Sequence, residues 1–243
     1  MIVLVTDFGL DGPYIGQMIS VLYRIAPATP VVNLFANAPT HNPRATAYLL
    51  AAYAPYLPPE SIFLCVVDPG VGSGVHQPVI VRANDQWFVG PDNGLFTIIT
   101  KRARGFRRWA ITWRPDSLSA SFHGRDLYAP VAARLARGEP PMGEPLSTRM
   151  IAEPWPDDLY EVIYIDHFGN AMTGIRASVL SKDRVLKVNG QSLKFARTFA
   201  DVEVGQTFWY QNANDLVELA VNQGRADALL GIRVSDPITL LQY

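Results

Sequence analysis

The chain has 243 residues, 49% of them hydrophobic, which is enough apolar side chain for one large domain or two modest ones. Its 21 basic and 22 acidic residues leave a formal charge of −1, which excludes the basic composition typical of proteins that bind nucleic acids or anionic membranes. Cys65 is the only cysteine, so an internal disulfide bond and a cysteine-based metal site are also excluded.

The first part of the chain alternates between strand and helix patterns. Apolar runs predict strands over Ile2–Thr6, Val31–Phe35 and Ile62–Val67. Helical spacing of apolar residues after Pro13 and after Pro43 predicts a helix in each interval. Strands and helices that alternate in this way are typical of right-handed crossovers, so we predict an α/β N-terminal domain with a mostly parallel sheet.

After the third strand the pattern changes to shorter elements. Val79–Arg82 and Trp87–Val89 flank a turn and predict a hairpin. Leu95–Thr100 and Arg108–Thr112 are further short apolar segments, and apolar spacing over Arg125–Arg137 predicts a helix. These segments complete the N-terminal domain, which we place at residues 1–145.

Residues 138–158 contain five prolines, and within this stretch residues 146–158 are the predicted linker to a second domain at residues 159–243. Short strand patterns in this second part predict a small all-β barrel or sandwich. The expected strands are Leu159–Ile165, Val185–Val188, Thr207–Gln211, Leu216–Val221 and Ile238–Leu241, with a helical turn at Ala226–Leu230.

Targeting and membrane signals are missing from the sequence. The first strand pattern has no basic segment or cleavage signal before it, and no apolar run approaches the roughly 20 residues of a membrane-spanning helix. We therefore expect a cytoplasmic protein.

Asp68 directly follows the buried third strand and begins a turn rich in proline and glycine. Ligands of open parallel sheets bind beyond the carboxyl ends of the strands, so an acid at this place is a candidate for chemistry. The alternative is that Asp68 only starts the turn, as Asp before Pro commonly does. Gly70, Gly72 and Gly74 would let a ligand approach the backbone, but the lysine of a phosphate-binding loop is missing.

Three further polar clusters also lie at strand ends or in loops. Asp7 follows the first strand and is suited either to accept ribose hydroxyls or to form a turn. His123 precedes a helix, whose dipole favours a neutral imidazole that can accept a proton; a structural role is the alternative. Asp166, Phe168 and Asn170 are suited either to hold an amino-acid moiety or to form a hairpin turn.

The four histidines, His41, His76, His123 and His167, do not form a metal-binding motif. No pair has the i, i+4 spacing of helical zinc ligands, and no HExxH sequence occurs. We therefore expect no metal site.

Taken in chain order, the clusters form a series of motifs. TDFG at residues 6–9, VVDPGVGS at 66–73, GPDNG at 90–94, FHGRD at 122–126 and DHFGN at 166–170 are followed by the run from Asn212 to Gly224. In this order and spacing, the chain resembles the S-adenosyl-L-methionine hydroxide adenosyltransferase family over essentially its whole length. That family is related to the fluorinase and chlorinase, which use halide against the same substrate.

The resemblance implies a hydrolase that converts S-adenosyl-L-methionine and water to adenosine and L-methionine, with no cofactor. It also implies a homotrimer whose site lies between the N-terminal domain of one subunit and the C-terminal domain of the next. Asp68 and His123 would orient and deprotonate the water. The residues that the resemblance assigns to substrate binding are Asp7, Phe8, His41, Phe122, Asp166, Phe168, Asn170, Asn212 and Asn214.

The physical chemistry of the implied reaction suits a single base. The leaving group is a neutral thioether expelled from a sulfonium, so it needs no general acid, whereas the attacking water must lose a proton. A carboxylate held tightly against the sulfonium would stabilise the ground state more than the transition state. We therefore expect Asp68 to face the water and C5′ of the substrate.

The chain departs from the family pattern at two places. Val75 and His76 stand where relatives usually carry arginines, one of which is catalytic, and Ala213-Asn214 stands where a serine pair is common. Either His76 or another basic residue replaces the arginine, or water activation is weaker. Two alternatives thus remain: a halide-using enzyme of the same superfamily, and a protein that binds the substrate or adenosine without turnover.

Overall fold

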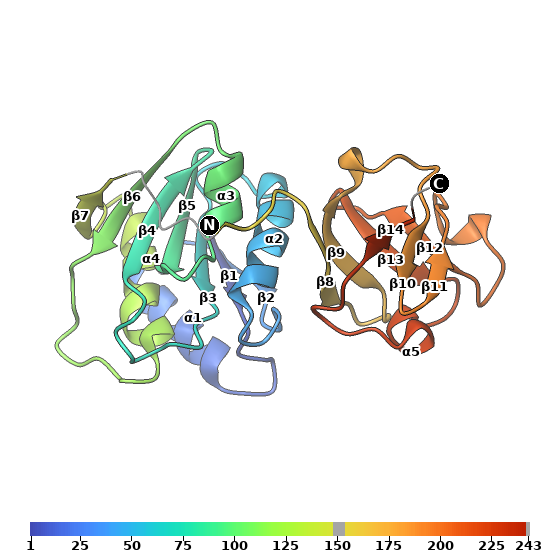
Figure 1. The fold of residues 1–243 in the computed structure, drawn as a ribbon. Coiled ribbons are helices and arrows are strands. Elements are labelled where there is room, and N and C mark those ends of the chain that lie inside the picture. The colour runs from blue at the N-terminus through green and yellow to red at the C-terminus, as the bar shows by residue number, and fades with distance from the viewer. Residues whose placement is uncertain (148–153, 242–243) are drawn as a thin grey trace. The chain divides into compact units, whose positions relative to one another are not determined.

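The computed structural model describes residues 1–147 and 154–241 of the chain, which fall into two units (Figure 1). The first unit comprises Met1–Leu50 and Ala54–Pro154, and the second comprises Ala51–Tyr53 and Trp155–Tyr243. Of the predicted linker at 146–158, residues 148–153 lie outside the described residues. No helix in the described ranges has both the length and the apolar character that crossing a membrane requires.

A seven-stranded sheet forms the centre of the first unit, with the strand order β2-β1-β3-β5-β4-β6-β7. The strands β2, β1, β3 and β5 run parallel, while β4, β6 and β7 extend the sheet with antiparallel pairs. The expected α/β fold with a mostly parallel sheet is confirmed. The strands are β1 (Ile2–Thr6), β2 (Val31–Phe35), β3 (Ile62–Val66), β4 (Pro78–Ala83), β5 (Gln86–Pro91), β6 (Phe106–Ile111) and β7 (Gly143–Leu146).

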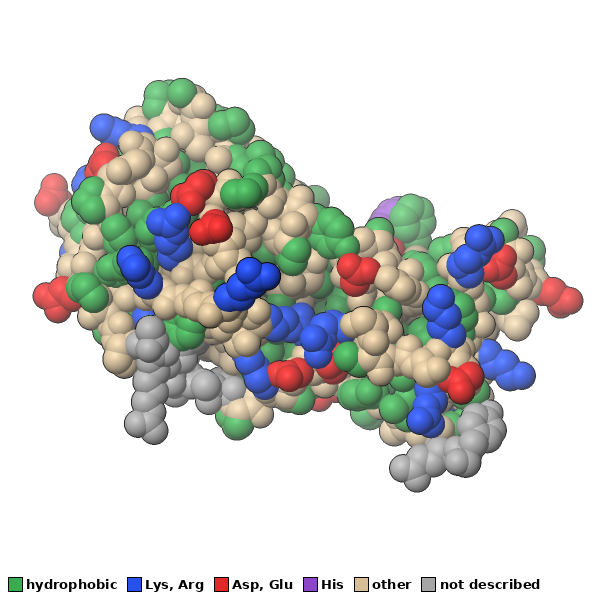
Figure 2. All heavy atoms as spheres, turned by 90° about the horizontal axis from the view of Figure 1, so that it is seen from above, with side chains coloured by type: hydrophobic (Ala, Val, Ile, Leu, Met, Phe, Trp, Pro, Cys, Tyr) green, Lys and Arg blue, Asp and Glu red, His purple; other side chains and the backbone are tan. Residues whose placement is uncertain are grey.

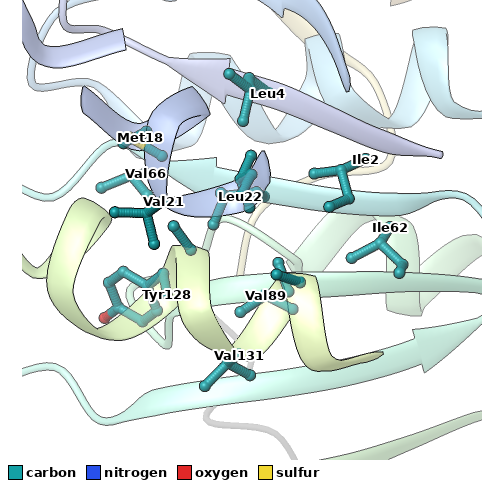
Figure 3. Packing of buried hydrophobic residues seen from close by; sticks show 14 of the residues in the cluster. Ile2, Leu4, Met18, Val21, Leu22, Ile62, Val66, Val89, Tyr128 and Val131 are labelled. Carbon is teal, nitrogen blue, oxygen red and sulfur yellow. The ribbon is translucent and has the colours of Figure 1, made fainter. Parts of the chain in front are cut away.

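Apolar side chains cover both faces of the central strands. On one face, alternate residues of β1 and β3, such as Leu4 and Val66, pack against Met18 and Leu22 of α1 and Val131 of α4 (Figure 3). The intervening residues of these strands are also buried, which explains their continuous apolar runs. The helices of this unit are α1 (Tyr14–Ile25), α2 (Pro43–Tyr53) up to Leu50, α3 (Thr97–Arg102) and α4 (Ala129–Ala136), with a short 3₁₀ turn, η1 (Ala54–Tyr56).

The helix expected over Arg125–Arg137 is two elements in the structure. A π-helical turn, η2 (Gly124–Tyr128), precedes α4, and the Ala129 amide donates a hydrogen bond to the Gly124 carbonyl. Pro130 has no amide hydrogen and lies in the first turn of α4, where none is needed. The turn η2 directly follows His123 and therefore fixes where that residue lies.

The second unit consists of two antiparallel sheets, with the orders β12-β13-β9-β8 and β11-β10-β14. Side chains from both sheets, including Leu186, Leu193, Val217 and Leu219, form one apolar core. The all-β expectation is confirmed. The elements are β8 (Leu159–Ile165), β9 (Ala171–Arg176), η3 (Ala177–Val179), β10 (Leu186–Val188), β11 (Gln191–Leu193), η4 (Phe199–Asp201), β12 (Thr207–Gln211), β13 (Leu216–Val221), α5 (Ala226–Leu230) and β14 (Thr239–Leu240).

Charge is distributed evenly over the surface that Figure 2 shows. Basic and acidic side chains are interspersed there among apolar and neutral polar ones. This pattern agrees with the net charge of −1.

Candidate active site

Asp68 lies just beyond the end of β3, in a turn that its own backbone and side chain stabilise. The Asp68 carbonyl accepts a hydrogen bond from the Val71 amide at 3.2 Å, and Oδ1 accepts one from the Gly70 amide at 3.1 Å. The side chain is 6% exposed. Oδ2 accepts no hydrogen bond from any described residue, so it remains available to a water or a substrate.

His76 is the direct partner of this carboxylate. Its Nδ1 lies 2.8 Å from Asp68 Oδ1. Because a carboxylate can only accept, the contact selects the state in which Nδ1 carries the hydrogen. The imidazole lies against Gly70, where an added Cβ would come within 2.7 Å of the ring, so only glycine leaves room for this arrangement.

A second loop, residues 112–123, approaches the Asp68 turn through backbone contact. Gly72 has φ +79°, and an added Cβ would lie 2.3 Å from the carbonyl oxygen of Ala120. Glycine is therefore required both for its backbone conformation and for the close approach. This approach brings His123, at the end of the second loop, to the Asp68 turn.

Asp126 fixes the second loop in place. Its Oδ2 accepts a hydrogen bond from the Ser119 amide at 3.0 Å, and its two oxygens bind the Arg125 guanidinium at 2.6 and 3.0 Å. The hydrogen bond from Arg125 is the main cause that lowers the pKa of Asp126 from its ordinary value. The carboxylate therefore stays ionised and continues to anchor the loop at mildly acidic pH.

Together the two loops enclose a pocket of about 400 Å³, which we call the Asp68 pocket. It is large enough for a water molecule and part of a ligand, and a carboxylate and two imidazoles face it. The imidazole of His123 makes no hydrogen bond with any described residue. The pocket is lined by Asp68, Gly70, Gly72, Gly74, His76, Gln77, Pro78, Arg114, Leu118, His123 and Leu127.

Arg114 is the charged residue of this pocket that the sequence analysis did not identify. Its Nη1 donates to the carbonyl oxygens of Ile111 at 2.7 Å and Trp113 at 2.8 Å, which fixes the guanidinium at the end of β6. Burial and then the Asp68 charge raise the pKa of the Tyr128 hydroxyl, whereas Arg114 lowers it, so both charges act on this buried side chain (Figure 3). The only signal in the sequence was a basic residue just after an apolar run.

Three aromatic rings gather at the second loop, which contains Phe122. The ring centroids of Phe8 and Phe122 are 5.8 Å apart, and Tyr14 lies 6.0 Å from Phe8 and 5.4 Å from Phe122. The structure thus brings together the two phenylalanines selected from the sequence and adds Tyr14, which was not selected. Edge-to-face rings of this kind are suited to pack against a flat ligand group.

Asp7 and His41 are neighbours in the structure. Oδ2 of Asp7 accepts a hydrogen bond from the His41 backbone amide at 2.9 Å, and His41 has φ 55°, which is rare for a residue with a side chain. The parallel register pairs Thr6 with Val66, so Asp7 and Asp68 leave the sheet at the same edge. Asp7 therefore stabilises a loop, and one of its oxygens, Oδ1, accepts no hydrogen bond from a described residue.

A second pocket, of about 670 Å³, lies within the second unit. Asp166 and Asn170 close the β8–β9 hairpin there: the Asn170 amide donates to Asp166 Oδ1 at 2.8 Å. Phe168, at the tip of this turn, is 71% exposed. The segment is thus a hairpin turn and also part of a pocket wall. The lining residues are Asp166, Phe168, Asn170, Phe199, Tyr210, Val221, Gln223, Gly224 and Arg225.

Asn212 and Asn214 do not line this second pocket. Asn212 is buried, and its Oδ1 accepts hydrogen bonds from the amides of Asn214 at 2.9 Å and Leu216 at 3.0 Å. Its Nδ2 donates to Glu218 Oε2 at 2.7 Å. The side chain of Asn212 therefore organises the β12–β13 turn, a role that the sequence did not suggest.

No three histidine, cysteine, aspartate or glutamate side chains cluster as metal ligands in the parts of the chain that the structure describes. The functional groups that line the two pockets are single carboxylates, imidazoles, guanidinium groups, amides and aromatic rings.

Two family models match most of the chain. The SAM hydroxide adenosyltransferase N-terminal domain matches residues 2–144, and the C-terminal domain of the same family matches residues 160–239.

Curated relatives are similar over almost their entire length. A protein of Thermus thermophilus, named (R)-S-adenosyl-L-methionine hydrolase, is 38% identical over 97% of each chain. A protein of Salinispora tropica with the same name is 38% identical over 95% of this chain and 94% of the relative.

Solved structures share the fold over the whole chain. An uncharacterized conserved protein from Thermotoga maritima superposes with a TM-score of 0.90 at 29% identity, covering 100% of both chains. A conserved hypothetical protein from Thermus thermophilus superposes with a TM-score of 0.78 at 34% identity, covering 99% of both chains. The chain therefore belongs to the S-adenosyl-L-methionine hydroxide adenosyltransferase family.

Proposed function

We propose that this protein hydrolyses S-adenosyl-L-methionine to adenosine and L-methionine. The observation that carries the proposal is the contact between Asp68 and His76 in a pocket that His123 also lines. These groups supply the base that water attack requires. The names of the curated relatives support the same substrate and reaction.

In the proposed step, a water oxygen attacks C5′ of the substrate in line with the sulfonium. A C5′–O bond forms, the C5′–S bond breaks, and its electron pair remains on sulfur as a neutral thioether. The water loses one proton, which Asp68 or His123 accepts. Positioning the water in this pocket contributes through proximity, and the base contributes through proton transfer.

Asp68 is suited to orient the water because its two oxygens differ. Oδ1 is occupied by the Gly70 amide and His76, which fixes the direction of the carboxylate. Oδ2 is then left to accept a hydrogen bond from the water. His76 thus serves as the partner of Asp68 at the place where relatives usually carry an arginine.

Arg114 supplies a permanent positive charge to the same pocket. The attacking water becomes more negative as it loses its proton, while the sulfonium loses its positive charge as the C5′–S bond breaks. A cation near the water therefore favours the transition state over the ground state. We propose Arg114 as the basic residue that acts together with His76 in place of the family's arginine.

The substrate-binding roles are also proposals. Asp7 would accept the ribose hydroxyls through its free oxygen, Phe8 and Phe122 would pack against the nucleoside, and His41 would lie beside them. The second pocket would hold the amino-acid or adenine end with Asp166, Phe168 and Asn170. Asn212 and Asn214 would act through the shape of the β12–β13 turn.

We also propose a cytoplasmic homotrimer that needs no cofactor. In such a trimer, the Asp68 pocket of one subunit would act with the second pocket of a neighbouring subunit, as the family resemblance implies. Light scattering of the purified protein measures its mass in solution, and a monomeric mass for the active enzyme would contradict this arrangement.

The decisive experiment is hydrolysis in heavy-oxygen water (H₂¹⁸O). We expect adenosine and methionine in equal amounts, with the heavy isotope in the 5′-hydroxyl of adenosine, because C5′ is the atom attacked. The Asp68→Asn variant is the control for contaminating activity. Binding without any adenosine would contradict the proposal, and a halogenated nucleoside formed in the presence of chloride or fluoride would identify a halide-using enzyme.

A further inference from the structure

Glu218 is a buried carboxylate in the middle of β13, with 2% of its surface exposed. Its neighbours Val217 and Leu219 belong to the apolar core between the two sheets. Because side chains alternate along a strand, Glu218 lies on the opposite face, next to its cross-strand partner Tyr210. An apolar residue is usual at such a position, so the carboxylate requires a specific explanation.

Each oxygen of Glu218 accepts one hydrogen bond. The Tyr210 hydroxyl donates to Oε1 at 2.7 Å, and Asn212 Nδ2 donates to Oε2 at 2.7 Å. Asn212 cannot exchange its amide nitrogen for its oxygen, because that oxygen already accepts two backbone hydrogen bonds in the turn. The carboxylate therefore connects a residue of the second pocket, Tyr210, with the β12–β13 turn.

Burying the carboxylate of Glu218 lowers the stability of the folded state. Burial raises its pKa, and the nearby charge of Asp166 raises it further, against the opposing effect of the two hydrogen bonds. Replacing a buried charged group by a well-packed apolar one is often neutral or stabilising. The stability of the fold therefore does not explain why residue 218 is a glutamate. A role in the adjacent pocket explains it.

The charges around the second pocket favour a cationic ligand group. Asp166 and Glu218 both contribute negative charge. Arg225, the basic residue that lines the pocket, is already paired with Asp227 through Nε at 3.0 Å and Nη2 at 2.8 Å. The net electrostatic potential in the second pocket is therefore negative, as expected for a site that accepts an ammonium group.

We propose that Glu218 is a positioning residue that makes this pocket selective for the α-ammonium group of the substrate. By accepting the hydroxyl hydrogen of Tyr210, it leaves only the oxygen lone pairs of that hydroxyl to a ligand. The pocket then offers acceptors and negative charge to the amino-acid end of the substrate. The inference rests on the proposed function, which supplies the identity of that substrate.

The Glu218→Gln variant distinguishes this positioning role from a role of Glu218 in packing alone. Glutamine has nearly the same shape, and its single oxygen can still accept the hydrogen bond of Asn212. Its amide nitrogen would then donate to the Tyr210 oxygen, which occupies a lone pair and releases the hydroxyl hydrogen. The Glu218→Gln variant should thus keep the turn but change Tyr210 from an acceptor toward a donor.

The experiment compares S-adenosyl-L-methionine with its deamino analogue, the same sulfonium with hydrogen in place of the α-ammonium. For the natural protein we expect the KM of the analogue to exceed that of the substrate by about tenfold, the effect of one charge-assisted hydrogen bond. In Glu218→Gln this preference should largely disappear, while kcat on the analogue changes by less than about twofold. Glu203→Gln, an exposed position in the same unit, is the matched control.

Equal losses on both compounds, or an unchanged preference, would overturn the role of Glu218. Tyr210→Phe provides a second test if Glu218→Gln does not fold, because it removes the hydroxyl and should also abolish the preference. If the natural protein forms no adenosine, the proposed hydrolysis fails by itself. Calorimetric binding of the two compounds then still decides whether Glu218 selects the ammonium group.

Discussion

Nδ1 of His76 lies 2.8 Å from Oδ1 of Asp68, and this contact fixes the direction of the carboxylate that lines the Asp68 pocket. A histidine and a carboxylate that meet in this way fix each other's orientation. The backbone permits the contact only because residue 70 is glycine.

Asp68→Asn should abolish most of the hydrolysis while the fold persists. The asparagine oxygen can still accept the hydrogen bonds of Gly70 and His76, but the side chain no longer provides a base. We expect kcat to fall by about 100-fold or more, the usual contribution of a general base. Adenosine formation, followed by chromatography, measures the effect; near-normal turnover would show that Asp68 is not required.

His76→Ala should reduce kcat by about tenfold to 100-fold, because Asp68 loses the partner that fixes its direction. His76→Arg should recover much of this loss, since a guanidinium can bind the same carboxylate through two hydrogen bonds. Steady-state kinetics of the two variants is the measurement. Equal activity of the alanine and arginine variants would argue against an orienting role of residue 76.

Arg114→Gln should lower kcat by about tenfold with little change in KM, because its charge acts on the transition state. Arg114→Lys should be less impaired, since the charge remains. Arg104→Gln removes an exposed arginine at another place in the first unit and serves as the control. A rise in KM at constant kcat would instead assign Arg114 to substrate binding.

Gly72→Ala and Gly74→Ala form a matched pair. Both residues have positive φ, +79° and +73°, so each alanine costs about 1–2 kcal/mol of stability through backbone strain. At residue 72 the new Cβ also meets the carbonyl oxygen of Ala120 at 2.3 Å, whereas at residue 74 no atom lies within 4 Å. Only Gly72→Ala should separate the two loops and lose activity. Denaturant unfolding and kcat of both variants test this, and equal effects would contradict the loop contact.

The pH dependence of stability should differ between the natural protein and Glu218→Gln. The folded pKa of Glu218 is raised, so the folded state holds its proton more tightly than the unfolded state does. Its stabilising contribution is therefore complete below the ordinary pKa of 4.5 and is lost as pH rises through the folded value. The ionisable groups that shift the pKa of Glu218 are Tyr210, through its hydrogen bond, and Asp166, through its charge.

The direction of this pH dependence can be tested by thermal unfolding. The midpoints of the two proteins are measured from mildly acidic to neutral pH. The midpoint of the natural protein should fall relative to that of Glu218→Gln as pH rises. Carboxylates with a lowered pKa, such as Asp126 and Asp227, give the opposite slope but are common to both proteins. A constant difference between the two midpoints would show that Glu218 does not titrate in this range.

Elements with a strong apolar pattern were predictable from the sequence. The strands β1, β2 and β3 and the helix α2 lie where the apolar runs and the proline at the helix start predict them. β9 was missed because it contains Gly174, which weakens a strand pattern. The structure explains this glycine, since an added Cβ would lie 2.6 Å from the Leu159 side chain on the neighbouring strand.

The sequence by itself determined the family and the class of both units, because motif order and apolar periodicity are local properties of the chain. It also selected Asp68 and His123 as candidate catalytic residues. Only the tertiary structure placed His76 on Asp68, brought Arg114 into the same pocket and connected Glu218 with Tyr210 and Asn212. These contacts form because loops and strands that are distant in the sequence pack against each other. The spacing of residues along the chain does not show which of these segments meet.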